Sequence, residues 1–166
     1  AALREKGLLR GEGGDVTCDA YVIPEGGTAM AYVTNLENRP RLVPQLKETF
    51  LALEGVSRVL EPADYHGFGL PTPEENDQMA DLVMVAKDGY SFTGANTGDP
   101  VIDILPAASP GNHGYLSTDP DMDAIFIAWG YGIRAGQRLG VVNSVDLAPT
   151  IAALLGLKMD GVAGKR

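Results

Sequence analysis

The chain has 166 residues, 45% of them hydrophobic and 21% charged, which is the size and composition of one globular domain with a hydrophobic core. Its net charge is −9, but residues 61–130 carry one basic side chain against twelve acidic ones. Such an acidic region repels a phosphate backbone, which argues against duplex nucleic acid as a partner. The acidic residues suit either divalent metals or a plain solvated surface, and composition leaves both open.

Neither cysteine usage nor hydropathy places the chain in a compartment. The single cysteine, Cys18, excludes an internal disulfide and leaves the localisation unknown. No apolar run reaches the ~20 residues that a membrane span needs, and no signal peptide is visible. We therefore expect no contact with a membrane.

The first sixty residues predict a compact set of elements. Residues 3–9 predict the end of a helix closed by glycine, and a helix that begins mid-pattern suggests a piece of a longer protein. The alternating runs 19–23 and 28–33 flank a Pro-Glu-Gly-Gly turn, which predicts a β-hairpin. Apolar residues at spacings of three and four predict a helix over 41–53, and a short strand follows at 56–60.

The middle of the chain adds one strand and one long loop. Residues 61–70 predict a helical turn, and the continuous apolar run 82–86 predicts a strand buried on both faces. Residues 93–110 hold several glycines and prolines and predict an irregular surface loop. We predict that strand 82–86, strand 56–60 and the second hairpin strand share one sheet, in a βαβ-containing lobe over residues 1–110.

A histidine between glycines follows that loop, in the run Gly111-Asn112-His113-Gly114-Tyr115. The flanking glycines let the backbone take a positive φ and approach a bound group closely, with the imidazole as the titratable side chain. Taken alone, His113 is either a site residue or an ordinary surface histidine.

The last block is the most regular part of the sequence. The apolar run 124–129 predicts a strand, and a glycine-punctuated loop and Val141-Val142 come after it. A helix is predicted next, with Asn143 or Ser144 as the N-cap and Gly156 at its end.

The histidine motif, the run 124–133 and the helical segment 145–157 occur in a recognisable order. This order resembles the C-terminal part of the type I phosphodiesterase/nucleotide pyrophosphatase family, in the alkaline phosphatase superfamily. The resemblance is close over residues 111–157 and looser before them. It implies an α/β fold that is the C-terminal portion of an alkaline-phosphatase-like fold, with residues 1–110 as a cap-like lobe and 111–166 as part of the phosphodiesterase core.

The resemblance also implies a chemistry. Members of that family hydrolyse phosphate or phosphonate esters with two divalent metals, usually zinc, and a threonine or serine nucleophile. The histidine of their Gly-x-His-Gly motif is a metal ligand, and His113 occupies that position. Neutral imidazole is a good zinc donor, so binding would weaken at acid pH. The implied cofactor is thus a divalent metal, zinc, and the implied substrate a small phosphate ester.

Most of the family's site has no counterpart in this chain. The nucleophile and the other metal-ligand motifs are absent, His66 matches no motif and is interpreted as solvated or capping, and Thr150 is interpreted as structural. Three aspartates near His113 either support the ligand or form a plain acidic loop: Asp119, Asp121 and Asp123. We therefore expect the chain alone to be inactive and to bind metal weakly at most.

Three interpretations remain open. The first is a C-terminal segment of a metal-dependent hydrolase, which would dock against a missing N-terminal part of the fold or associate with itself. The second is a non-catalytic α/β module of the same ancestry that binds a partner through its acidic middle. The third is an unrelated small α/β domain with a chance motif. The coding sequence upstream of Ala1 separates the first two, because an in-frame nucleophile motif would support the first.

Overall fold

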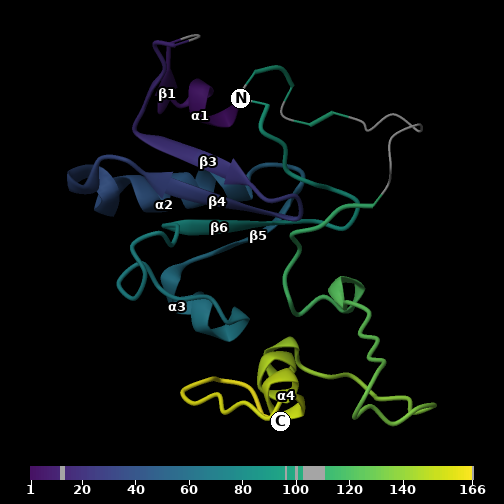
Figure 1. Cartoon of the computed structure of the whole chain (residues 1–166). Helices are drawn as coiled ribbons and strands as arrows, with labels where there is room; N and C mark the ends of the chain where they lie inside the picture. The colour runs from purple at the N-terminus through teal and green to yellow at the C-terminus, as the bar shows by residue number, and fades with distance from the viewer. Residues whose placement is uncertain (12–13, 96, 100, 103–110, 166) are drawn as a thin grey trace. The chain divides into compact units, whose positions relative to one another are not determined.

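The computed structural model describes residues 1–11, 14–95, 97–99, 101–102 and 111–165. They form two compact units, Ala1–Asp123 and Ala124–Arg166 (Figure 1). The mixture of helices and sheets confirms the predicted α/β class. The functional division that the sequence suggested, between residues 110 and 111, stays a prediction. The stretch 103–110, within the predicted surface loop, lies outside the described residues.

The first unit is built on a four-stranded antiparallel sheet with the order β3-β4-β6-β5. Its strands are β3 (Ala20–Pro24), β4 (Thr28–Val33), β5 (Val56–Leu60) and β6 (Leu82–Ala86). The hairpin of β3 and β4 is confirmed, and so is the shared sheet of β4, β5 and β6. Because β6 pairs with both β4 and β5, it lies inside the β4-α2-β5 unit as an antiparallel insertion (Figure 1).

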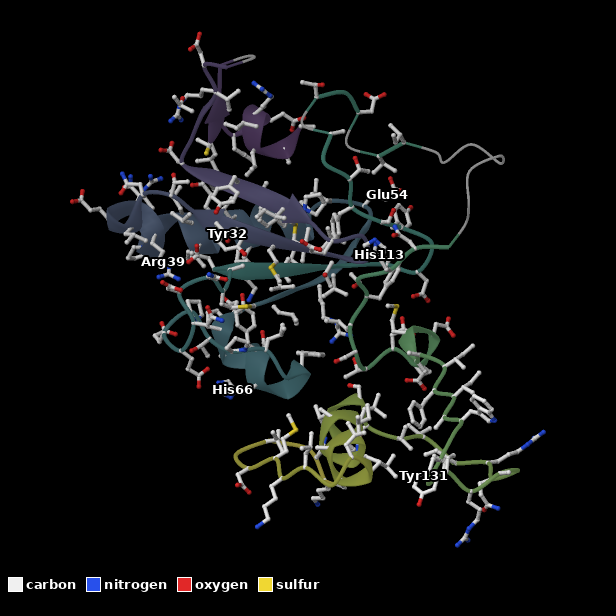
Figure 2. The ribbon with its side chains drawn as sticks, viewed as in Figure 1. Tyr32, Arg39, Glu54, His66, His113 and Tyr131 are labelled. Carbon is white, nitrogen blue, oxygen red and sulfur yellow. The ribbon has the colours of Figure 1, made fainter. Side chains whose placement is uncertain are left out.

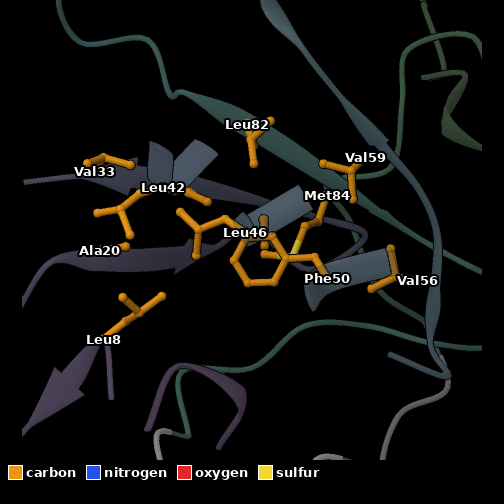
Figure 3. Close-up of a cluster of buried hydrophobic side chains, with 12 residues drawn as sticks. Leu8, Ala20, Val33, Leu42, Leu46, Phe50, Val56, Val59, Leu82 and Met84 are labelled. Carbon is orange, nitrogen blue, oxygen red and sulfur yellow. The ribbon is translucent and has the colours of Figure 1, made fainter. Parts of the chain in front are cut away.

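Helix α2 (Arg39–Leu51) covers one face of this sheet. Its buried residues Leu42, Leu46 and Phe50 recur every four positions and pack with strand residues (Figure 3), among them Val33, Leu82 and Met84. Ala29 and Ala31 of β4 belong to the same cluster. Alanine at two positions of β4 leaves room for the large helical side chains. Burying each of those side chains stabilises the fold by about 1.5–3 kcal/mol. The predicted helix is confirmed and ends two residues earlier, at Leu51.

A second cluster covers the opposite face of β6. Val83 and Val85 pack with residues of the segment that precedes β6, namely Leu60, Tyr65, Met79 and Ala80. Tyr65 ends the short helix α3 (Pro62–Tyr65), and its hydroxyl donates to the Ala80 carbonyl oxygen at 3.0 Å. All five residues of β6 are buried, which confirms the prediction of a strand covered on both faces.

The remaining elements are short. In the first unit they are α1 (Ala2–Glu5), β1 (Leu9–Arg10) paired with β2 (Thr17–Cys18), and the 3₁₀ turns η1 (Leu36–Asn38), η2 (His66–Phe68) and η3 (Pro120–Met122). The second unit holds η4 (Ser144–Asp146) and α4 (Leu147–Leu154), in place of one predicted helix. The helix expected to run to residue 9 ends at Glu5, because Gly7 takes a left-handed φ of 67°. None of the described helices is both long enough and apolar enough to cross a membrane.

The strand predicted at residues 124–129 does not form, so this prediction is wrong. Ile125, Ile127 and Trp129 are 90%, 84% and 95% exposed. A strand needs a hydrogen-bonding neighbour, and within the described residues this stretch pairs with none. The segment is apolar, as the pattern indicates, but the described part of the chain contains no strand that pairs with it.

One ion pair, between Arg39 and Asp81, connects several elements of the first unit. The Asp81 carboxylate is buried, pairs with the Arg39 guanidinium and accepts a hydrogen bond of 2.7 Å from the backbone N–H of Val33. It therefore links the start of α2 to the end of β4 and the segment that enters β6. Burying a carboxylate is tolerated only with such partners.

We predict that Asp81→Ala lowers the free energy of unfolding by about 1–3 kcal/mol, because it leaves the buried Val33 N–H without its acceptor. Urea unfolding measures this. Asp77→Ala is the matched control, since Asp77 is exposed, and it should change stability by no more than about 0.5 kcal/mol. Equal effects of the two substitutions would contradict the role of Asp81.

Candidate functional site

His113 lies on a loop that packs against the turn between β3 and β4. The backbone N–H of Gly27 donates to the His113 carbonyl oxygen at 2.8 Å. The side chain of Asn112 accepts from the His113 N–H, also at 2.8 Å. The residue is exposed, as its flanking glycines predicted, so its imidazole is accessible while its backbone is held.

The two histidines of the chain lie in different places on the first unit (Figure 2). His66 follows α3, and its Nε2 lies 3.0 Å from Oε2 of Glu75. The same carboxylate accepts from the backbone N–H of Thr72 at 2.8 Å. His66 is thus an exposed, capping histidine, as predicted, and it does not converge on His113.

The acidic residues near His113 are used locally. Asp119 caps η3, and its Oδ1 accepts from the Asp121 N–H at 3.0 Å. Among the described residues, no three His, Cys, Asp or Glu side chains lie close enough together to hold a metal ion. The described residues therefore place one imidazole, that of His113, at this position, and a complete metal site would need further ligands.

A shallow pocket of about 610 Å³ lies beside the His113 loop without including His113 itself. It is lined by residues at the start of β5, at the end of β6 and in the turn after it, and by five residues of the later loop: Tyr115, Leu116, Thr118, Asp119 and Pro120. Two cations and two carboxylates line it: Arg58, Lys87, Asp88 and Asp119. The formal charges of its lining side chains therefore cancel.

Thr150 occupies a structural position in the second unit. Its Oγ1 donates to the Asp146 carbonyl oxygen at 2.6 Å, one turn earlier at the start of α4. A hydroxyl engaged in this way satisfies the helix backbone. This geometry agrees with the structural interpretation of Thr150.

Sequence reasoning missed the groups that surround the His113 loop. Tyr115 donates from its hydroxyl to the Tyr90 carbonyl oxygen at 2.7 Å, and the hairpin turn at Gly26-Gly27 receives the loop. The adjacent glycines in the turn are a sequence signal of this contact, but turn chemistry alone is enough to explain them. Nothing local in the sequence pairs that turn with residue 113.

The chain is similar to part of the curated protein bis(5'-adenosyl)-triphosphatase ENPP4. The human protein is 28% identical over 87 residues, and the mouse protein is 27% identical over 85 residues, in each case 51% of this chain and 17% of the relative. The bovine protein is 24% identical over 146 residues, which is 87% of this chain and 26% of the relative.

The chain therefore spans about a quarter or less of the length of the curated relatives that it matches. No protein-family model matches it, and no solved structure matches it significantly. These low-identity, partial matches suggest a distant relationship to nucleotide pyrophosphatases/phosphodiesterases.

We predict that Glu75 titrates below its ordinary range in the folded chain. The Thr72 backbone N–H, which hydrogen-bonds the ionised carboxylate, lowers the pKa of Glu75, and the charge of His66 adds to this effect. A depressed pKa means that the stabilisation is present above the unfolded pKa and is lost as the pH falls through the folded one. Carbon-13 NMR titration in buffer and in urea measures the two midpoints, and equal midpoints would contradict this prediction.

Proposed function

We propose that this chain is the C-terminal segment of a metal-dependent hydrolase of phosphate or phosphonate esters, with His113 as one metal ligand. The observation that carries the proposal is an exposed histidine in a Gly-Asn-His-Gly motif, on a loop whose backbone is held by a distant turn. The partial similarity to ENPP4 supports the same class of enzyme.

His113 suits a metal by its chemistry. A neutral imidazole is a common zinc ligand, and its exposure leaves a ring nitrogen free to reach an ion at the surface of the first unit. A bound metal would polarise the phosphoryl oxygen and activate a nucleophile. One imidazole does not complete a centre of three or four protein ligands, so the described residues alone would bind zinc weakly.

The substrate class in this proposal is a small phosphate ester. The relatives are named for hydrolysis of bis(5'-adenosyl) triphosphate, a compound in which a triphosphate joins two adenosyl groups. The region 61–130 has one basic residue against twelve acidic ones, which disfavours binding along a nucleic-acid duplex.

The partner in this proposal is the remainder of the hydrolase fold, or a second copy of this chain. The exposed side chains of Ile125, Ile127 and Trp129 support it, since contiguous exposed apolar residues mark interaction surfaces. Residues 124–129 form no strand, and a segment this apolar is stabilised when a partner covers it.

We predict that the purified 166-residue chain hydrolyses neither a nitrophenyl phosphate nor a nitrophenyl phosphodiester in the presence of zinc. The reason is that it offers one candidate ligand and no nucleophile motif. Release of nitrophenolate is the measurement. Zinc-dependent turnover that disappears in His113→Ala would contradict the proposal that the chain is an incomplete segment.

A second prediction concerns the product of the complete coding sequence that contains this chain. His113→Ala should lower zinc affinity and hydrolysis of bis(5'-adenosyl) triphosphate by at least ~10–100-fold, the effect of removing even an outer partner of a ligand. His66→Ala is the matched control and should leave both unchanged. Full activity and full zinc content in His113→Ala would exclude the proposed role, and a product without any hydrolase motif would favour the non-catalytic module.

A further inference from the structure

Both backbone polar groups of His113 are engaged by specific partners. Its N–H donates to Oδ1 of Asn112, and its carbonyl oxygen accepts from Gly27, both at 2.8 Å. The first bond is made within the loop, and the second ties the backbone of residue 113 to the β3–β4 turn. The rotation of the imidazole about its side-chain bonds still has to be ordered when it binds a ligand.

The β3–β4 turn and the His113 loop lie so close together that neither has room for a side chain at the contact. A Cβ added at Gly27 would lie 2.2 Å from Cγ of Tyr115, and one at Gly26 would lie 2.4 Å from the His113 carbonyl oxygen. On the loop side, a Cβ at Gly114 would lie 1.6 Å from the Glu25 carbonyl oxygen. Gly26 and Gly114 also take left-handed φ values of 84° and 77°. The close approach therefore depends on glycine on both sides.

The turn and the loop are each anchored to the sheet. The carbonyl oxygen of Gly27 accepts from the Ala86 N–H at 2.9 Å, and that of Gly26 accepts from the Phe92 N–H at 2.7 Å. The Tyr115 hydroxyl donates to the Tyr90 carbonyl oxygen. The end of β6 and the residues after it thus hold both halves of the contact.

We propose that Gly27 and Tyr115 are positioning residues for His113, and that the β3–β4 turn holds the backbone of this residue in place for metal binding. The role of the metal in this inference rests on the proposed function. The ordering of the His113 backbone by the turn is independent of it. The turn lies far from His113 in the sequence, so the proposed metal-binding histidine is held by a distant part of the first unit. A ligand held in place loses less freedom on binding, which raises affinity.

The first test uses the 166-residue chain and amide relaxation measured by NMR. In the unsubstituted chain the His113 N–H should show the order parameter of a rigid backbone, about 0.85, and in Gly27→Ala it should fall below about 0.6. Gly94→Ala is the matched control, because Gly94 has a negative φ and nothing within 4 Å of an added Cβ. An unchanged order parameter in Gly27→Ala would overturn the inference.

A milder variant covers the case in which Gly27→Ala fails to fold. Tyr115→Phe keeps the ring against the turn and removes the hydroxyl that bonds Tyr90. It should increase the hydrogen-exchange rate of the Gly27 amide, whereas Tyr131→Phe, at a fully exposed position, should not. Equal exchange in both variants would remove Tyr115 from the proposal.

The second test separates positioning from the proposed function. In the product of the complete coding sequence, Gly27→Ala should weaken zinc binding ~10–100-fold in a chelator competition, and Gly94→Ala should not. If His113→Ala leaves zinc affinity unchanged, the proposed function fails while the NMR result stands. If His113→Ala weakens zinc binding and Gly27→Ala does not, positioning fails and the proposed function stands.

Discussion

The burial of β6 on both faces is the constraint on which the first unit depends. Leu82 and Met84 join the core beneath α2, while Val83 and Val85 join the cluster around Tyr65. The same strand hydrogen-bonds β4 on one side and β5 on the other. Its last residue, through Ala86 N–H, also holds the turn that receives the His113 loop. Apolar burial in the sheet is thus connected by backbone hydrogen bonds to the candidate site.

The sequence predicted those parts of the fold whose information is local. The hairpin followed from alternation around a Gly-Gly turn, and α2 followed from apolar residues three and four positions apart. The strand expected at 124–129 failed because an apolar run states only that a segment would be buried, not which neighbour buries it. Strand formation is a property of a pair, and local pattern describes one member of that pair.

The candidate site divides in the same way. The exposure of His113 was predictable from glycine on either side, since that composition is typical of a surface loop. Its backbone partners were not predictable, because Gly27 belongs to a turn formed much earlier in the chain. A hairpin turn alone explains glycines at positions 26 and 27. Their additional role, which is to let another loop approach closely, therefore cannot be recognised from the sequence. A contact of this kind is visible only in three dimensions.

The exposed apolar segment that follows Asp123 has a consequence for the behaviour of the chain in concentrated solution. From Ala124 to Ile133 there is neither a charge nor a proline, and β-branched and aromatic residues dominate. Short uncharged segments of this composition stack into cross-β fibrils when they are left uncovered. Asp123 before the stretch and Arg134 after it act against this, since copies stacked in register would bring like charges together. These two flanking charges oppose in-register stacking of the segment, and salt weakens their effect by screening them.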